Sequence, residues 1–189
     1  MVRCAPRAPS GPRALLLGLA LVLCAAPGQG RADQGPGDFG RFSETLVRCS
    51  LTIPAAGGEV RSCGRLRIDQ AQERVLSVRF SVLPGAGRSG GEDLVFAGIL
   101  SSTSAPMACR KDGRCQPRFP VELRVNAIAS GRFTRLGLAA TLPRALLARG
   151  RCHIEAAGAR CEATAQDGER WLAEGFFPSS QPASGRVWR

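Results

Sequence analysis

Six of the chain's eight cysteines occur in three pairs, and each pair encloses a short segment that contains a glycine. Two cysteines on either side of a tight turn lie opposite each other when the segment folds as a β-hairpin. Directly opposed residues of an antiparallel pair come close enough for a disulfide without movement of the backbone. The spacing therefore constrains the chain to antiparallel hairpins. It predicts the disulfides Cys49–Cys63, Cys109–Cys115 and Cys152–Cys161.

The residues between the cysteines set the register of each hairpin. In the shortest hairpin, a loop at residues 111–113 places Gly113 at the left-handed position of a type I turn with a bulge, so that Arg110 faces Arg114. Loops at residues 155–158 and 55–57, which also end on a glycine, bring the other two cysteine pairs into opposition in the same way.

Zinc binding and thiol redox chemistry are the competing interpretations of the cysteines. A zinc site needs thiolates and histidines at short spacing, but the chain has no Cys-x-x-Cys motif and a single histidine, His153. The missing motif also argues against a redox-active dithiol. We therefore expect disulfides, no metal site and no cofactor.

Residues 1–32 have the pattern of a secretory signal peptide. Arginines precede an apolar core at residues 14–26, which is too short to span a bilayer, and small residues follow up to Ala32. Cleavage after Ala32 would leave Asp33 as the first residue of the mature chain. Because disulfides persist in oxidising compartments, we expect a periplasmic or extracellular protein with no transmembrane segment in the mature chain.

Alternating apolar and polar residues predict short strands along most of the remaining chain. The clearest strand, at residues 74–83, has four apolar residues on one face: Leu76, Val78, Phe80 and Val82. Further strands are predicted at residues 93–100, 120–129, 132–142 and 170–177. In the strand at 120–129 the residues predicted to face inward are Val121, Leu123, Val125 and Ala127.

One segment, residues 142–149, predicts a short helix, with Pro143 in its first turn and Gly150 as its stop. The predicted fold class is all-β: an antiparallel β-sandwich or small barrel with disulfide-stapled hairpins and this one short helix. A single exported β-domain is expected at residues 33–178. The Gly-, Pro- and Ser-rich residues 179–189 predict a flexible C-terminal tail.

The formal net charge of +11 comes almost entirely from arginine, since Lys111 is the only lysine. An arginine excess of this kind is typical of a GC-rich genome, so the charge by itself does not indicate a function. The chain has no tyrosine, and aromatic residues make up 5% of it. Because stacking platforms for bases are therefore scarce, we do not expect it to bind nucleic acid.

The candidate ligand-binding residues are those of the shortest predicted hairpin, Arg110, Lys111 and Arg114, together with Arg118 behind it. A disulfide-closed loop holds its cations in fixed directions, so that an acidic partner is bound at a smaller entropic cost. Further candidates for this surface are Arg144, Arg149 and Arg151. The alternative interpretation is a solvated turn that carries the arginines common throughout this chain.

No residue is assigned a catalytic role. Residues 87–91 match Gly-x-Ser-x-Gly, but a nucleophile elbow lies between a strand and a helix, whereas this segment lies between two predicted strands. His153 would face Arg160 across its hairpin. The neighbouring acids Glu92 and Asp93 would point to opposite faces of a strand.

The sequence therefore favours a non-catalytic binding protein, exported to the periplasm or the extracellular space. The acidic partner of its basic loop would be a protein, a glycan or a lipid headgroup. Two alternatives remain. The first is a secreted protease inhibitor whose closed basic loop mimics a substrate. The second is an envelope hydrolase that brings carboxylates together from distant strands, a geometry that no local motif reveals.

Overall fold

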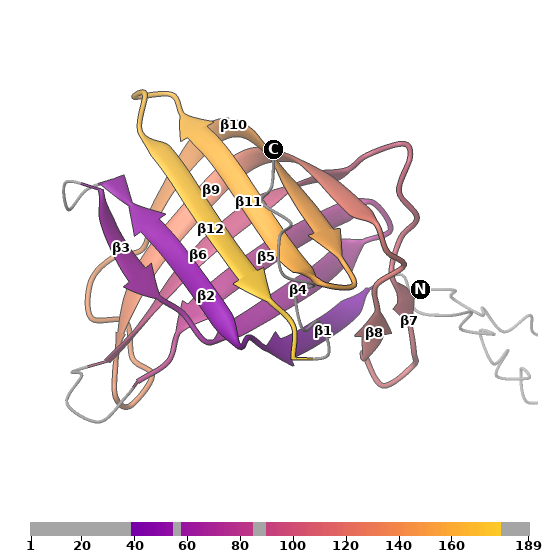
Figure 1. Ribbon diagram of the computed structural model, residues 1–189, viewed down its shortest axis with the longest axis horizontal. Coiled ribbons are helices and arrows are strands. Elements are labelled where there is room, and N and C mark those ends of the chain that lie inside the picture. The colour runs from indigo at the N-terminus through magenta and orange to yellow at the C-terminus, as the bar shows by residue number, and fades with distance from the viewer. Residues whose placement is uncertain (1–38, 55–57, 85–89, 179–189) are drawn as a thin grey trace, which may run out of the picture. The chain divides into compact units, whose positions relative to one another are not determined.

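The computed structural model describes residues 39–54, 58–84 and 90–178. The predicted leader at residues 1–32 and the predicted tail at residues 179–189 lie outside these ranges. The described residues form the strands labelled in Figure 1. In chain order they are β1 (Gly40–Thr45), β2 (Arg48–Ile53), β3 (Glu59–Ser62), β4 (Arg65–Gln72), β5 (Val75–Val82), β6 (Gly90–Leu100), β7 (Ala108–Cys109), β8 (Cys115–Gln116), β9 (Val121–Thr134), β10 (Arg144–Glu155), β11 (Gly158–Ala165) and β12 (Arg170–Phe176).

Ten of these strands form one antiparallel sheet in the order β1-β4-β5-β6-β9-β10-β11-β12-β2-β3. The sheet curls into a half-barrel, so that β11, β12 and β2 cross in front of β4, β5 and β6 (Figure 1). Strands β7 and β8 form a separate small hairpin. The predicted antiparallel all-β fold with disulfide-closed hairpins is confirmed.

The two ends of the curled sheet, β1 with β4 and β2 with β3, are the two halves of one bent hairpin. Strands β1 and β2 follow each other along one arm, and β3 and β4 along the other. Hydrogen bonds continue across the bend, because Leu46 N donates to Gly64 O at 2.9 Å and Cys63 N donates to Cys49 O at 3.2 Å. The Cys49–Cys63 disulfide lies at this bend, with 4.9 Å between its Cα atoms.

The other two disulfides join the strand positions that the turn residues predicted. Cys109 lies opposite Cys115, and Cys152 lies opposite Cys161, each pair with its Cα atoms 4.0 Å apart. The loop after β10 is tighter than predicted, because Glu155 pairs directly with Gly158, but the register of the hairpin is unchanged. Three disulfides are typical of a protein that folds in an oxidising environment.

Inward-facing side chains from both halves of the sheet fill one core. The alternation predicted for β5 is confirmed, since its four inward residues are at most 7% exposed. The largest fully buried side chains are Trp171, Phe80 and Phe96. The rings of Phe80 and Phe96 meet edge to face with their centroids 6.3 Å apart, a favourable aromatic geometry.

The inward face of β9 differs from its prediction after Val125. The pairing with β6 passes from Ala97 opposite Ala127 to Gly98 opposite Val125, so that Asn126 forms a bulge. A bulge inserts one extra residue and reverses the side on which the following side chains point. Ile128 is therefore the buried residue, at 2% exposure, and the prediction that Ala127 faces inward is wrong.

The predicted helix at residues 142–149 is also wrong. Strand β10 begins at Arg144 and pairs with β9 on one side and β11 on the other, which supplies the hydrogen bonds that a helix would have made internally. The predicted strand at 132–142 is correct only as far as Thr134, where β9 ends. The chain then turns at Gly137, which has a φ of 77°. Within the described residues, the fold contains no helix with both the length and the apolar character needed to cross a bilayer.

The disulfide at the bend is expected to stabilise the fold by restricting the unfolded chain. Replacing both Cys49 and Cys63 by alanine opens a loop with a sequence separation of 14, and it should lower the free energy of unfolding by about 3 kcal/mol. Urea denaturation of the oxidised proteins measures the difference. A loss below about 1 kcal/mol would contradict a stabilising role for this crosslink.

Candidate functional site

The base of the predicted basic hairpin is anchored in the protein core. Cys109 and Cys115 are 4% and 2% exposed, and the nearby Met107 is 5% exposed. Buried Gln70, near the end of β4, accepts a hydrogen bond from Met107 N at 2.8 Å. Its amide nitrogen lies 3.7 Å from the Sγ atom of Cys109. The base of the hairpin is thus held by a disulfide, by apolar packing and by a buried amide.

The tip of the hairpin has the predicted turn. Arg110 N donates to Arg114 O at 2.8 Å and Gly113 N donates to Arg110 O at 3.0 Å. Gly113 takes the left-handed conformation, with a φ of 80°. The carboxylate of Asp112 accepts a hydrogen bond from Arg114 N at 3.0 Å. These contacts satisfy the backbone groups of the turn and fix the directions in which its side chains leave.

The hairpin also lies against the free edge of β1. Arg41 N donates to Gly113 O at 2.7 Å, and Arg41 and Arg114 form a parallel bridge. The approach is close, because a Cβ atom added at Gly40 would lie 2.5 Å from both Gly113 O and the Sγ atom of Cys115. A glycine is therefore needed at position 40. The contact also covers part of an otherwise open sheet edge, a site prone to unwanted strand pairing.

Four cations were predicted for this site, and the structure brings three of them together. Arg110, Lys111 and Arg114 share the exposed tip of the hairpin, and the side chain of Arg114 is 83% exposed. Arg118 is exposed too, but it lies beyond β8, in the segment that leads to β9. We call Arg110, Lys111 and Arg114 the basic tip.

Arg41 is a further cation beside the basic tip, and the sequence analysis did not find it. Its side chain is 57% exposed and its Nε atom donates to Asp69 at 2.8 Å. Asp69 also accepts from Arg67 at 2.7 Å. Burial raises the pKa of Asp69, but the hydrogen bonds from the two arginines outweigh this effect, and the net pKa lies below its ordinary value.

The arginines of β10 do not join the basic tip, which corrects the expectation for Arg144, Arg149 and Arg151. Arg144 lies at the start of β10 and is bound to Asp167 at 2.9 Å and Glu169 at 2.8 Å. Arg149 is exposed further along β10, and Arg151 is paired with Glu162 at 3.2 Å. The sheet order places these side chains on the β10–β12 surface, away from the edge strand β1.

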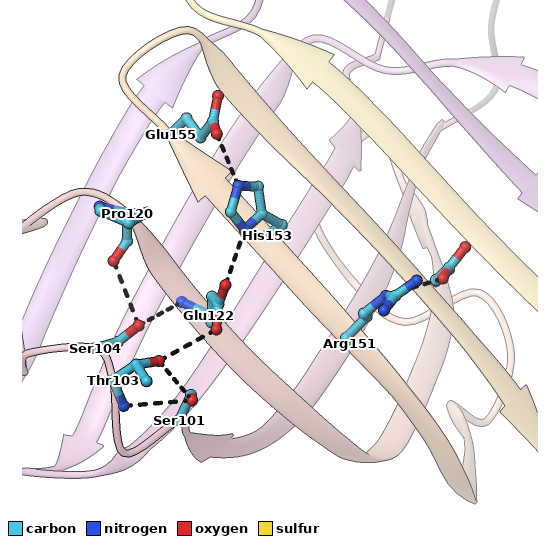
Figure 2. Close-up of polar contacts among 9 residues, drawn as sticks. Ser101, Thr103, Ser104, Pro120, Glu122, Arg151, His153 and Glu155 are labelled. Carbon is cyan, nitrogen blue, oxygen red and sulfur yellow. Dashed lines mark hydrogen bonds and ion pairs between the residues drawn. The ribbon is translucent and has the colours of Figure 1, made fainter. Parts of the chain in front are cut away.

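His153 lies on the outer face of β10 between two carboxylates (Figure 2). Its Nε2 atom is 2.8 Å from Glu155 Oε1, and its Nδ1 atom is 3.7 Å from Glu122 Oε1. The predicted cross-strand partner, Arg160, is indeed opposite His153 in the register, but its guanidinium lies 3.8 Å from Glu174. The two carboxylates that flank the imidazole could not be predicted from the sequence pattern.

Two hydroxyl groups extend this cluster. The Oγ1 atom of Thr103 donates to Glu122 Oε2 at 3.3 Å and lies 2.9 Å from the hydroxyl of Ser101 (Figure 2). In these contacts the carboxylate of Glu122 stands between the hydroxyls and His153. A catalytic triad has the imidazole between the hydroxyl and the carboxylate. The cluster therefore has the character of a structural network that ties the loop after β6 to β9 and β10.

The Gly-x-Ser-x-Gly match falls mostly outside the described residues. Only its last two glycines are described, and they open β6. Among residues 39–54, 58–84 and 90–178, no group of three or more His, Cys, Asp and Glu side chains is arranged to hold a metal ion.

The chain matches no protein-family model, no curated protein and no solved structure. Its function therefore has to be inferred from the chemistry of its own surfaces.

The contact of the hairpin with β1 can be tested through Gly40. A Gly40→Ala substitution should push the hairpin off the edge of β1, because the added methyl group collides with backbone and disulfide atoms. Hydrogen exchange of the Arg41 amide should then speed up by at least about tenfold, while the amides of β10 and β11 keep their protection. Unchanged exchange at Arg41 would contradict the contact.

The network around Asp69 predicts a pH dependence. Because the pKa of Asp69 is lowered in the folded state, its stabilising contribution is present above the unfolded-state pKa of about 3.9 and is lost as the pH falls through the folded-state value. An Asp69→Asn substitution should thus cost up to about 1 kcal/mol at pH 7 and progressively less toward about pH 2. Urea unfolding of both proteins across this range measures the effect. An equal cost at both ends would rule it out.

Proposed function

We propose that this chain is an exported, non-catalytic binding protein that engages an anionic ligand through the basic tip, Arg110, Lys111 and Arg114. The observation that carries the proposal is the contrast between the two ends of one hairpin. Its base is buried and crosslinked, whereas its tip holds three exposed cations in a turn closed by internal hydrogen bonds. A preorganised group of cations loses little entropy on binding an anion.

The surroundings of the tip support the proposal. Arg41 lies beside Arg114, which adds a fourth cation to the same edge. Its charge is shared with Asp69, so that part of the local field is neutralised before any ligand arrives. Guanidinium groups bind carboxylate, sulfate and phosphate oxygens through paired hydrogen bonds, and this chemistry sets the class of ligand. The predicted leader and the three disulfides support export, to the periplasm or the extracellular space.

The turn geometry favours this role over a protease inhibitor. A substrate-like inhibitory loop presents an extended backbone to the protease, whereas residues 110–114 form a tight turn with internal hydrogen bonds. A hydrolase is supported less well by the described carboxylates. The most buried of them, Glu92, is ion-paired with Arg61 and lies 3.6 Å from Arg132. Ion pairing of this kind also occurs in purely structural networks.

The proposal is tested with two polyanions, a labelled poly-glutamate peptide and dextran sulfate. The oxidised protein should bind at least one of them, with an affinity that falls as salt is added. A variant with Arg110→Ser, Lys111→Ser and Arg114→Ser should bind at least about tenfold more weakly, because it loses the three positive charges of the basic tip.

A charge-matched variant provides the control. Replacing Arg65, Arg124 and Arg149 by serine removes an equal number of positive charges, but from the outer face of the sheet. It should retain most of the binding. Equal losses in the two variants would show that only net charge matters, and they would reject the basic tip as a site.

A further inference from the structure

The loop that joins β9 to β10, residues 135–143, exposes a cluster of leucines. Leu136, Leu138 and Leu142 are 86%, 64% and 94% exposed. Between Leu136 and Leu142 the only side chain with a polar atom is that of Thr141, since the others are leucine, glycine and alanine. Single exposed apolar residues are common on proteins, but three within seven positions form a patch of the kind that marks an interaction surface.

The leucines are held outward by an ordered backbone. Thr134 N donates to Leu138 O at 2.8 Å, Gly137 N donates to Thr134 O at 3.0 Å and Ala140 N donates to Arg132 O at 2.8 Å. The hydroxyl of Thr134 also accepts from Leu138 N at 3.2 Å. These bonds fix the backbone of the turn that carries Leu136 and Leu138. The loop is thus preorganised with its apolar side chains in water.

Cations flank this loop. The segment 123–154, which contains it, has six arginines and no Asp or Glu. Arg132 and Arg135 precede the leucines, and Arg144 follows them. The side chain of Arg132 is 56% exposed and 3.6 Å from Glu92. That of Arg144 is 41% exposed and paired with Asp167 and Glu169. Arginines therefore stand on both sides of the three leucines in the chain.

Another apolar side chain lies near the same loop. Val60, on the edge strand β3, is 67% exposed. It lines an open cavity of about 840 Å³ together with Ala140 and Thr141. Glu59, Arg61, Glu92 and Arg132 line the same cavity, so the surface between the loop and β3 is mixed, with both apolar and charged side chains.

We propose that the loop at residues 135–143 inserts its leucines into the surface of an anionic phospholipid bilayer. The leucines project from a turn instead of lining a groove, so they fit a fluid apolar phase that needs no matching cavity. An apolar loop flanked by arginines in the chain suits a bilayer, in which anionic headgroups overlie the acyl chains. Long arginine side chains can reach the headgroups while the leucines enter below them. This surface is separate from the basic tip and does not depend on its function.

The test is co-sedimentation of the oxidised chain without its predicted leader, residues 33–189, with vesicles. One set contains phosphatidylcholine alone, and the other contains about one third phosphatidylglycerol, a charge density that attracts basic segments. The protein should bind the second set more tightly. A variant with Leu136→Ser, Leu138→Ser and Leu142→Ser should lose at least about tenfold in partition coefficient, because three leucines no longer leave water.

Two control variants separate this proposal from others. Replacing Val47, Val75 and Ile99 by serine removes three exposed apolar side chains away from the loop, and binding should persist. The basic-tip variant with Arg110, Lys111 and Arg114 replaced should also bind vesicles, and it thereby distinguishes a failure of this proposal from a failure of the proposed function.

Three results would overturn the inference. The first is unchanged vesicle binding in the leucine variant, with its unfolding temperature confirming that it is folded. The second is equal binding to both vesicle compositions, which would remove the role of anionic headgroups. The third is a change of oligomeric state without lipid binding: the unmodified protein sediments as a dimer in the absence of vesicles, the leucine variant is a monomer, and neither protein binds lipid. The leucines would then contact a second copy of the chain.

Discussion

The curvature of the sheet depends on one bent hairpin, which runs from Gly40 to Gln72. One half of it pairs with β5 and the other half pairs with β12, so each end of the sheet is tied to the other through continuous chain. The backbone bonds at Leu46 and Cys63 keep the two arms paired across the bend. Flattening the sheet would break these bonds and expose the core. The Cys49–Cys63 disulfide adds a covalent link at the same bend.

The features that could be predicted from the sequence are those that local turns determine. Glycine-containing loops of a few residues set each hairpin register, and the cysteine pairing follows from that register. The wrong predictions concern residues whose structure depends on pairing with strands that are distant in the sequence. Residues 142–149 can form a helix by themselves, but β9 pairs with residues 144–147 and β11 with residues 148–149, and this pairing makes them strand, as tertiary pairing often does. The bulge at Asn126 had no local signal, because it is visible only in the pairing of β6 with β9.

The same distinction applies to the candidate site. Arg110, Lys111 and Arg114 were found because one short turn contains them all. Gln70 and Arg41 were not found, since their roles depend on β4 and β1 reaching the hairpin from about 40 and 70 positions away, and no turn chemistry encodes such contacts. The abundance of arginine in this chain also produced a wrong prediction. Arg144 was expected at the site, but it lies on β10, where Asp167 and Glu169 bind it.

Among the described surfaces, the two that differ most in character are the basic tip and the loop at residues 135–143 with its exposed leucines. Strand β9 separates them along the chain, with β8 before it and the loop after it. Its 14 residues would extend over roughly 45 Å at about 3.3 Å per residue, and somewhat less in a bulged and curved strand. This length is several times the screening distance of about 8 Å in physiological salt. A charged ligand at one surface would therefore have little electrostatic effect at the other, and coupling between them would have to pass through the sheet itself. Sites this far apart usually contribute independently, so binding at the two surfaces should be energetically independent.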